Sequence, residues 1–119
     1  MNDKKTTILQ LKTALHEFND ARDWSQYHNP RNLAMAVSVE ANELLSLFLW
    51  SSDNGPQPPV SSRLQNVHDE VADVMICLIN FCNSMNIDLT QAVNRKIQAN
   101  NAKYPVSKSR GKLEKHDEL

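Results

Sequence analysis

The sequence predicts an all-α protein, an antiparallel four-helix bundle that assembles into oligomers. Four segments of the 119-residue chain carry apolar residues at helical spacing. No segment shows the strict alternation of a half-buried strand, and two glycines are too few for a turn-rich β fold. A chain of this length supports one modest core. We therefore expect a single helical domain over 1–105 and a polar, flexible tail over 106–119.

The first two predicted helices have clear starts. Thr6 or Thr7 can cap the first helix with its hydroxyl. The apolar stripe of that helix consists of Ile8, Leu11, Leu15 and Phe18. A loop leads to Asn29 and Pro30, which suit an N-cap and the first helical position, where no amide donor is needed. The second helix is predicted to run from there to about Trp50.

A proline-rich break, "SSDNGPQPPVSS", separates the second helix from the third. The third predicted helix spans about 62–85 and is apolar over more than one face. A lone chain of this size cannot cover all of that surface, so part of it is predicted to face a second subunit. Asp88 caps the fourth helix, which must stop before Pro105 because the residue before a proline avoids the α region.

Charge and composition narrow the function classes. The net charge of -1 gives no attraction to nucleic acid or to an anionic membrane. No run approaches the roughly 18 apolar residues of a membrane helix, and "MNDKKTTILQ" lacks a signal-peptide core. We therefore expect a cytoplasmic protein and interpret the terminal "HDEL" as a chance match to a retention signal. Cys77 and Cys82 lie about 140° apart around one helix, which favours reduced core residues.

Two pairs of acidic residues interrupt the most hydrophobic predicted helices. Glu40 and Glu43 lie in the second helix, and Glu70 and Asp73 lie in the third. Each pair has the spacing i, i+3, so its two side chains share a helix face. If the helices pack face to face, four carboxylates converge, and such charges must take up protons, pair with bases or hold cations. A hard cation, Mg²⁺ or Mn²⁺, suits an all-carboxylate site.

The acidic pairs also allow other interpretations. The acids can simply face water on amphipathic helices. A di-iron carboxylate site requires Glu-x-x-His on two helices, and no His follows a Glu at that spacing here. A non-catalytic helical interaction module is the alternative function, although such a module gains nothing from clustered acids.

The motif ExxE on one helix followed by ExxD on the next resembles the MazG-like, all-α nucleoside triphosphate pyrophosphohydrolases. The segment "RDWSQYHNPRNLAMAVSVEANELLSLFLW" is similar to the dCTP pyrophosphatase branch in its RDW, H-x-PRNL, ExxE and final Trp. "KIQANNAKYP" resembles that branch's K-x-x-x-N-x-x-[RK]-Y-P signature. The resemblance covers roughly Phe18 to Pro105. It implies Mg²⁺-dependent cleavage of dNTPs, with dCTP favoured, to dNMP and pyrophosphate.

The resemblance also implies a nucleotide-pool sanitation role and assembly as a homodimer or homotetramer. The implied catalytic and metal-binding residues are Glu40, Glu43, Glu70 and Asp73. The implied substrate-binding residues are Trp24, His28, Asn32, Trp50, Lys96, Asn100, Lys103 and Tyr104. Ordinary core packing for the tryptophans and a solvated surface for the lysines are the alternatives. The branch has an aromatic residue where this chain has Cys77, so a relative that acts on dUTP or a phosphoribosyl nucleotide stays open.

Overall fold

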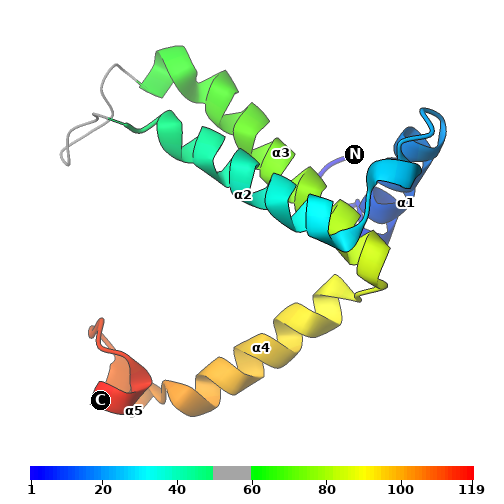
Figure 1. Ribbon diagram of the computed structural model, residues 1–119. Coiled ribbons are helices and arrows are strands. Elements are labelled where there is room, and N and C mark those ends of the chain that lie inside the picture. The colour runs from blue at the N-terminus through cyan, green and yellow to red at the C-terminus, as the bar shows by residue number, and fades with distance from the viewer. Residues whose placement is uncertain (50–59) are drawn as a thin grey trace. The chain divides into compact units, whose positions relative to one another are not determined.

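The computed structural model describes residues 1–49 and 60–119, without the side chains of 60–62. Within these residues every regular element is helical, which confirms the all-α prediction (Figure 1). The α-helices are α1 (Ile8–Asp20), α2 (Pro30–Ser46), α3 (Val60–Met85), α4 (Leu89–Lys103) and α5 (Val106–Ser109). The 3₁₀ helices are η1 (Ser25–Tyr27) and η2 (His116–Glu118). The chain divides into two compact units, Met1–Asn86 and Ile87–Leu119. The four-helix bundle stays a prediction.

The predicted helix starts are confirmed. The Thr7 hydroxyl accepts a hydrogen bond from the backbone amide of Gln10 at 3.1 Å. The Gln10 side chain accepts one from the Thr7 amide at 2.7 Å, which completes a capping box. Asn29 and Asp88 each accept a bond from the amide three residues on, at 2.8 and 2.9 Å. Capping side chains thus begin α1, α2 and α4 by satisfying amides that have no partner within the helix.

The predicted helix ends agree with the structure for α3 and α4 but not for α2. The α-helical part of α2 ends at Ser46, earlier than the predicted end near Trp50, and Trp50 lies outside the described residues. The Ser46 hydroxyl donates to the carbonyl of Glu43 at 2.7 Å, a local bond that competes with the helical pattern. The helix α3 ends at Met85 and α4 ends at Lys103, ahead of Pro105, as predicted.

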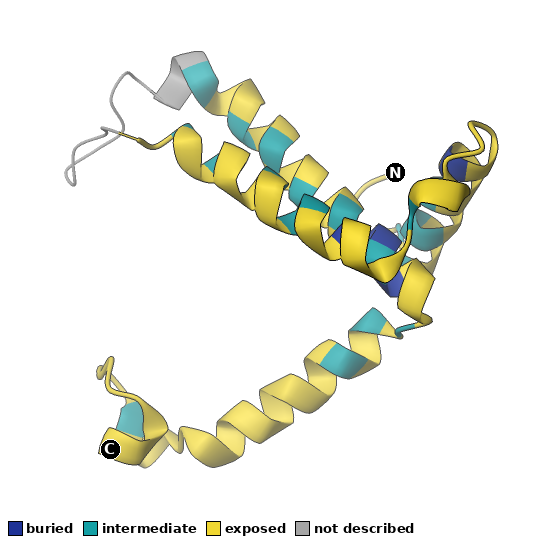
Figure 2. Ribbon diagram, viewed as in Figure 1, coloured by how far each residue is buried: buried dark blue, intermediate teal, exposed yellow. Residues whose placement is uncertain are grey.

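In the first unit, α2 and α3 run antiparallel side by side, and α1 packs against α3 (Figure 1). The buried apolar residues of the described chain are Leu33, Ile79 and Cys82 (Figure 2). Both cysteines are free thiols, as predicted. Large apolar side chains on α2 and α3 stay exposed, including Met35, Val39, Leu45, Leu64, Val71, Met75, Ile76 and Leu78. This core is small for three helices, so much apolar surface is left for another contact.

The second unit begins with α4 and continues into the segment predicted to be a tail. That segment contains α5 and η2. The rings of Tyr104 and His116 meet edge to face with centroids 5.8 Å apart, and Ser109 donates to the carbonyl of Tyr104 at 3.1 Å. Residues after Pro105 therefore make short-range contacts. The flexibility predicted for 106–119 stays a prediction. None of the helices in the described part of the chain is long and apolar enough to cross a membrane.

Candidate functional site

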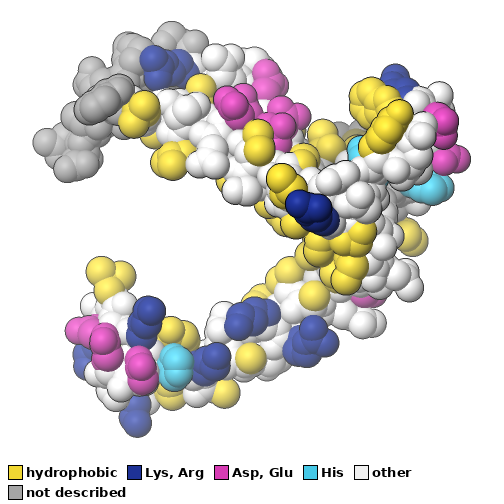
Figure 3. Space-filling view, viewed as in Figure 1, with side chains coloured by type: hydrophobic (Ala, Val, Ile, Leu, Met, Phe, Trp, Pro, Cys, Tyr) yellow, Lys and Arg dark blue, Asp and Glu magenta, His cyan; other side chains and the backbone are white. Residues whose placement is uncertain are grey.

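Three of the four predicted acidic ligands come together where α2 packs against α3. Glu40 on α2 and Glu70 and Asp73 on α3 each place one carboxylate oxygen within 4.8 Å of the others. Acidic side chains gather over these two helices in Figure 3. The spacing i, i+3 sets Glu70 and Asp73 on one face of α3, and the antiparallel neighbour supplies Glu40. We call these three residues the acid cluster.

Glu70 lies at the centre of the electrostatics of this cluster. Burial raises the pKa of the Glu70 carboxyl, and the negative charges of Asp73, Glu40 and Glu43 raise it further. Its oxygen Oε2 is fully enclosed and has no hydrogen-bond partner among the described residues. An enclosed carboxylate oxygen without a donor is costly, so the site favours a bound proton or a cation.

The donor set fits a hard divalent cation. All three groups of the acid cluster offer carboxylate oxygens, which are the ligands that Mg²⁺ and Mn²⁺ take in proteins. The enclosed Oε2 of Glu70 is the donor that such an ion would satisfy. Glu43 is exposed one turn along α2 and lies outside the group of close oxygens, so its role as a ligand stays a prediction.

Cys77 follows Asp73 by one turn on α3 and is half-buried. Burial raises the pKa of its thiol, and the charges of Glu40 and Asp73 add to the rise. The raised pKa keeps the sulfur protonated near neutral pH. Cys77 is a free thiol, as predicted, but it is half-buried and does not belong to the buried core.

A polar cavity of about 190 Å³ lies among the end of α1, η1 and the C-terminal half of α3. Its lining residues are His16, Asn19, Ser25, His28, Asn80, Asn83 and Ser84. Among them only His28 was predicted from the sequence as a site residue. Of the other lining residues, Asn80 could have been noticed in the sequence. It interrupts the apolar run "CLINFC" and so places an amide where a core side chain is expected.

The cavity and the acid cluster lie along one face of α3. Asn80 follows Asp73 by seven residues, which returns to nearly the same helix face after a rise of about 10 Å. A pocket for a whole ligand usually measures roughly 300–1,000 Å³. The smaller cavity therefore suits one ring system of a ligand, with the remainder outside.

Trp24 and Asn32 are two of the predicted substrate-binding residues. Trp24 is 44% exposed, and its ring meets Phe18 edge to face with centroids 5.8 Å apart. The guanidinium of Arg22 lies 3.7 Å from the Phe18 ring centroid. Asn32 donates from Nδ2 to the carbonyl of Tyr27 at 3.0 Å, so its amide joins η1 to α2. The structure does not bring Trp24 or Asn32 into the lining of the polar cavity.

The remaining predicted substrate-binding residues belong to the second unit. Lys96 and Asn100 are exposed on α4, four residues apart and hence on one face. Lys103 lies in the last turn of α4 and Tyr104 follows it. Their predicted contacts with phosphates stay predictions, as does the role of Trp50.

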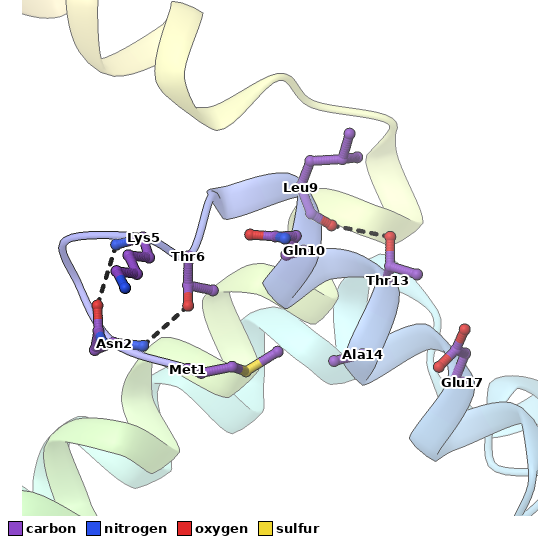
Figure 4. A pocket seen from close by; sticks show the side chains of 9 residues that line it. All are labelled: Met1, Asn2, Lys5, Thr6, Leu9, Gln10, Thr13, Ala14 and Glu17. Carbon is purple, nitrogen blue, oxygen red and sulfur yellow. Dashed lines mark hydrogen bonds between the residues drawn. The ribbon is translucent and has the colours of Figure 1, made fainter.

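A larger hollow of about 610 Å³ lies against α1 (Figure 4). Its lining residues are Met1, Asn2, Lys5, Thr6, Leu9, Gln10, Thr13, Ala14 and Glu17. Its polar groups are engaged locally, since the Asn2 amide donates to Thr6 at 3.0 Å and Thr13 donates to the Leu9 carbonyl at 2.9 Å. No member of the acid cluster and no predicted site residue lines this hollow, so size alone does not mark the site.

Comparison with known proteins finds relatives of this chain. The sequence profile described as the MazG-like family matches residues 35–119. The chain is 39% identical to "dCTP pyrophosphatase 1" of Mus musculus and 35% identical to that of Homo sapiens, covering 95% of this chain and 68% of each relative. A crystal structure of a pyrophosphatase from Archaeoglobus fulgidus is similar, with a TM-score of 0.78 and 37% identity. That similarity covers 88% of this chain and 98% of the other.

Proposed function

The chain belongs to the MazG-like family and is a nucleoside triphosphate pyrophosphohydrolase, and we propose that it is a Mg²⁺-dependent enzyme that favours dCTP. The activity is supported by relatives named dCTP pyrophosphatase at 35–39% identity over nearly the whole chain. The names of these relatives also support the proposed preference for dCTP. The metal dependence is supported by the acid cluster.

The single observation that carries the proposed mechanism is the enclosed, unpartnered Oε2 of Glu70 between two further carboxylates. A divalent ion bound by Glu40, Glu70 and Asp73, with Glu43 as the fourth predicted ligand, would neutralise triphosphate charge and acidify a bound water. The carboxylates hold that charge in a half-buried place, where electrostatic interactions are stronger than in bulk water.

In the proposed reaction a water oxygen attacks the α-phosphorus, and the bond from this phosphorus to the oxygen that bridges to the β-phosphorus breaks. The products are the nucleoside monophosphate and pyrophosphate. The proton of the attacking water passes to one of the four acids or to their neighbour Asp69. Asp69 itself accepts a hydrogen bond from Gln65 at 2.9 Å, which restrains its side chain. In-line attack would be favoured because the acids, by holding the cation, would fix the positions of both the water and the phosphate.

The polar cavity is the proposed place for the base. His28 lines it, and Asn80 places it about 10 Å along α3 from Asp73. Trp24 and Trp50 are proposed as aromatic contacts to the substrate, and Asn32 as a polar one. An aromatic ring stacked on a base contributes roughly 1–3 kcal/mol with little preference among bases, so discrimination rests on the polar groups.

The proposed phosphate-binding residues are Lys96, Asn100, Lys103 and Tyr104. Residues 87–119 carry seven Lys or Arg against four Asp or Glu, whereas acids outnumber bases in the rest of the chain. Such a basic segment suits a polyphosphate. We expect Lys96→Ala to raise KM for triphosphates more than it changes the melting temperature, because Lys96 is exposed.

Three broader proposals follow from the sequence. The exposed apolar residues of α2 and α3 support a homodimer or homotetramer. A cytoplasmic location and a role in sanitising the nucleotide pool are proposed from the substrate class.

The test is a panel of triphosphates, dUTP included, with product analysis. We expect dCTP to give dCMP and pyrophosphate in the presence of Mg²⁺ and no product with EDTA. Release of orthophosphate instead would place the cleavage at another bond. The absence of turnover on every triphosphate and on a phosphoribosyl nucleotide would favour the non-catalytic interaction module.

A further inference from the structure

We propose that the hydrogen-bonded side chains of Asn19 and Asn80, which we call the amide pair, read the hydrogen-bonding edge of the substrate's base. This inference rests on the proposed function, since it names two base-binding residues of that site. The amide pair is not among the residues that the sequence motifs single out.

The pair joins α1 to α3 at the polar cavity. Asn19 Nδ2 donates to Asn80 Oδ1 at 3.0 Å. The two residues are only 7% and 8% exposed, and they are the buried polar residues of the described chain. Both residues line the polar cavity. Burying two amides has a desolvation cost that a purely mechanical link between helices does not require.

An inventory of donors and acceptors shows what the pair offers. Each asparagine amide has a carbonyl oxygen and an NH₂ group. The bond between them uses the oxygen of Asn80 and the nitrogen of Asn19. Within the described residues no hydrogen bond is made to Asn19 Oδ1 or from Asn80 Nδ2. The bond between the amides also leaves one N–H of Asn19 and one lone pair of Asn80 unused, so the pair offers at least one acceptor and one donor to a ligand in the cavity.

This combination matches the hydrogen-bonding edge of a pyrimidine, and a purine presents the same donor and acceptor pair. Cytosine presents its 4-amino donor beside the N3 acceptor, and thymine or uracil presents the O4 acceptor beside the N3–H donor. If both amides turn over together, the bond between them is kept and the donor and acceptor exchange places. The amide pair therefore binds amino-pyrimidines and oxo-pyrimidines alike, and it does not make the enzyme exclusive for dCTP.

A mechanical role alone is a weaker account of the pair. The contact of α1 with α3 has a second side-chain link, because Asn83 Nδ2 donates to the carbonyl of Lys12 at 3.1 Å. Two residues of α3, Ile79 and Cys82, are also buried in the apolar core of this unit. The two roles differ in one expected result. Only a base-binding role predicts that removal of the pair changes the ratio of kcat/KM values between substrates that differ at the base edge.

The experiment is a double-mutant cycle between the pair and the base. The substrates are dCTP and its analogue with hydrogen in place of the 4-amino group, and the enzymes are the wild type and Asn19→Ala/Asn80→Ala. In the wild type we expect the analogue to lose about tenfold or more in kcat/KM, as one buried hydrogen bond is unmade. In the double variant we expect the two substrates to differ by less than about threefold.

The controls separate the inference from the proposed function. If the wild type does not hydrolyse dCTP, the proposed function fails. If it hydrolyses dCTP and the analogue equally well, or if the double variant keeps the tenfold penalty, the inference fails. Asn42→Ala changes an exposed α2 asparagine whose amide donates to the Ser38 carbonyl, and this variant should behave as the wild type. Should the double variant not fold, Asn80→Asp keeps the bond from Asn19 and changes the cavity donor to an acceptor. We then expect kcat/KM for dCTP and dTTP to fall together by about tenfold, and unchanged values overturn the inference.

Discussion

Glu40 of α2 and Glu70 of α3 hold carboxylate oxygens within 4.8 Å of each other across the contact of two antiparallel helices. One oxygen of Glu70 is enclosed and has no hydrogen-bond partner in the described chain. Two acids at this distance repel each other when both are ionised, unless a cation lies between them. The folded chain therefore contains unfavourable charge repulsion at the proposed active site.

Added Mg²⁺ should stabilise the protein. An ion that binds the folded state alone stabilises it by about 2.7 kcal/mol at a hundredfold excess over Kd. We expect the melting temperature to rise with Mg²⁺ in differential scanning calorimetry. Glu70→Gln should reduce this rise and abolish turnover, because it removes the charge at the centre of the cluster. Full activity in Glu70→Gln would show that the site is wrongly assigned.

Without metal, stability should fall as the pH rises. The raised pKa of Glu70 means that the folded state holds this proton more tightly than the unfolded state. The free energy of unfolding is therefore highest below the ordinary pKa of glutamate and declines until the raised pKa is passed. In EDTA at pH 8, Glu70→Gln should melt above the wild type, and the difference should shrink at acidic pH. Glu17→Gln, an exposed change on α1, should show no such difference.

The protein should be oligomeric at micromolar concentration. Leu78 is 38% exposed on α3, among other uncovered apolar residues, and a Lys there should weaken a contact on that face. We expect light scattering to report a dimer or tetramer for the wild type and smaller species for Leu78→Lys. Leu113→Lys, at a residue that is fully exposed, is the matched control and should assemble normally. A monomeric wild type would contradict the prediction.

Trp50→Ala should raise KM for several dNTPs together, by about tenfold or more. The reason is that a stacked aromatic contributes to binding without selecting the base. Kinetics and melting should be measured on the same sample. A lowered melting temperature together with an unchanged KM for every dNTP would assign Trp50 to the core instead.

His28→Ala should change the ranking among bases. His28 lines the polar cavity, where an unmade hydrogen bond discriminates between substrates. We expect the ratio of kcat/KM values between dCTP and dTTP to shift, while the Mg²⁺-induced rise in melting temperature stays as in the wild type. A uniform loss on all dNTPs would indicate that His28 supports the fold and does not read the base.

The sequence predicted the local features of this chain well. Thr7, Asn29 and Asp88 begin their helices as expected, because a capping side chain and the first amides of its helix are only a few residues apart. The end of α2 was predicted too late, because the apolar run continues past Ser46 while the local bond from Ser46 to Glu43 interrupts the helix.

The sequence by itself determined that Glu70 and Asp73 share a face of one helix and that Glu40 and Glu43 share a face of another, since helical geometry sets this. Only the tertiary structure decided that Glu40 joins the α3 pair while Glu43 lies outside the close group. It also decided that Asn19 and Asn80 meet in a buried pair beside a cavity. The physical reason is that the rotation and register of packed helices follow from their whole contact surface, which no local spacing specifies.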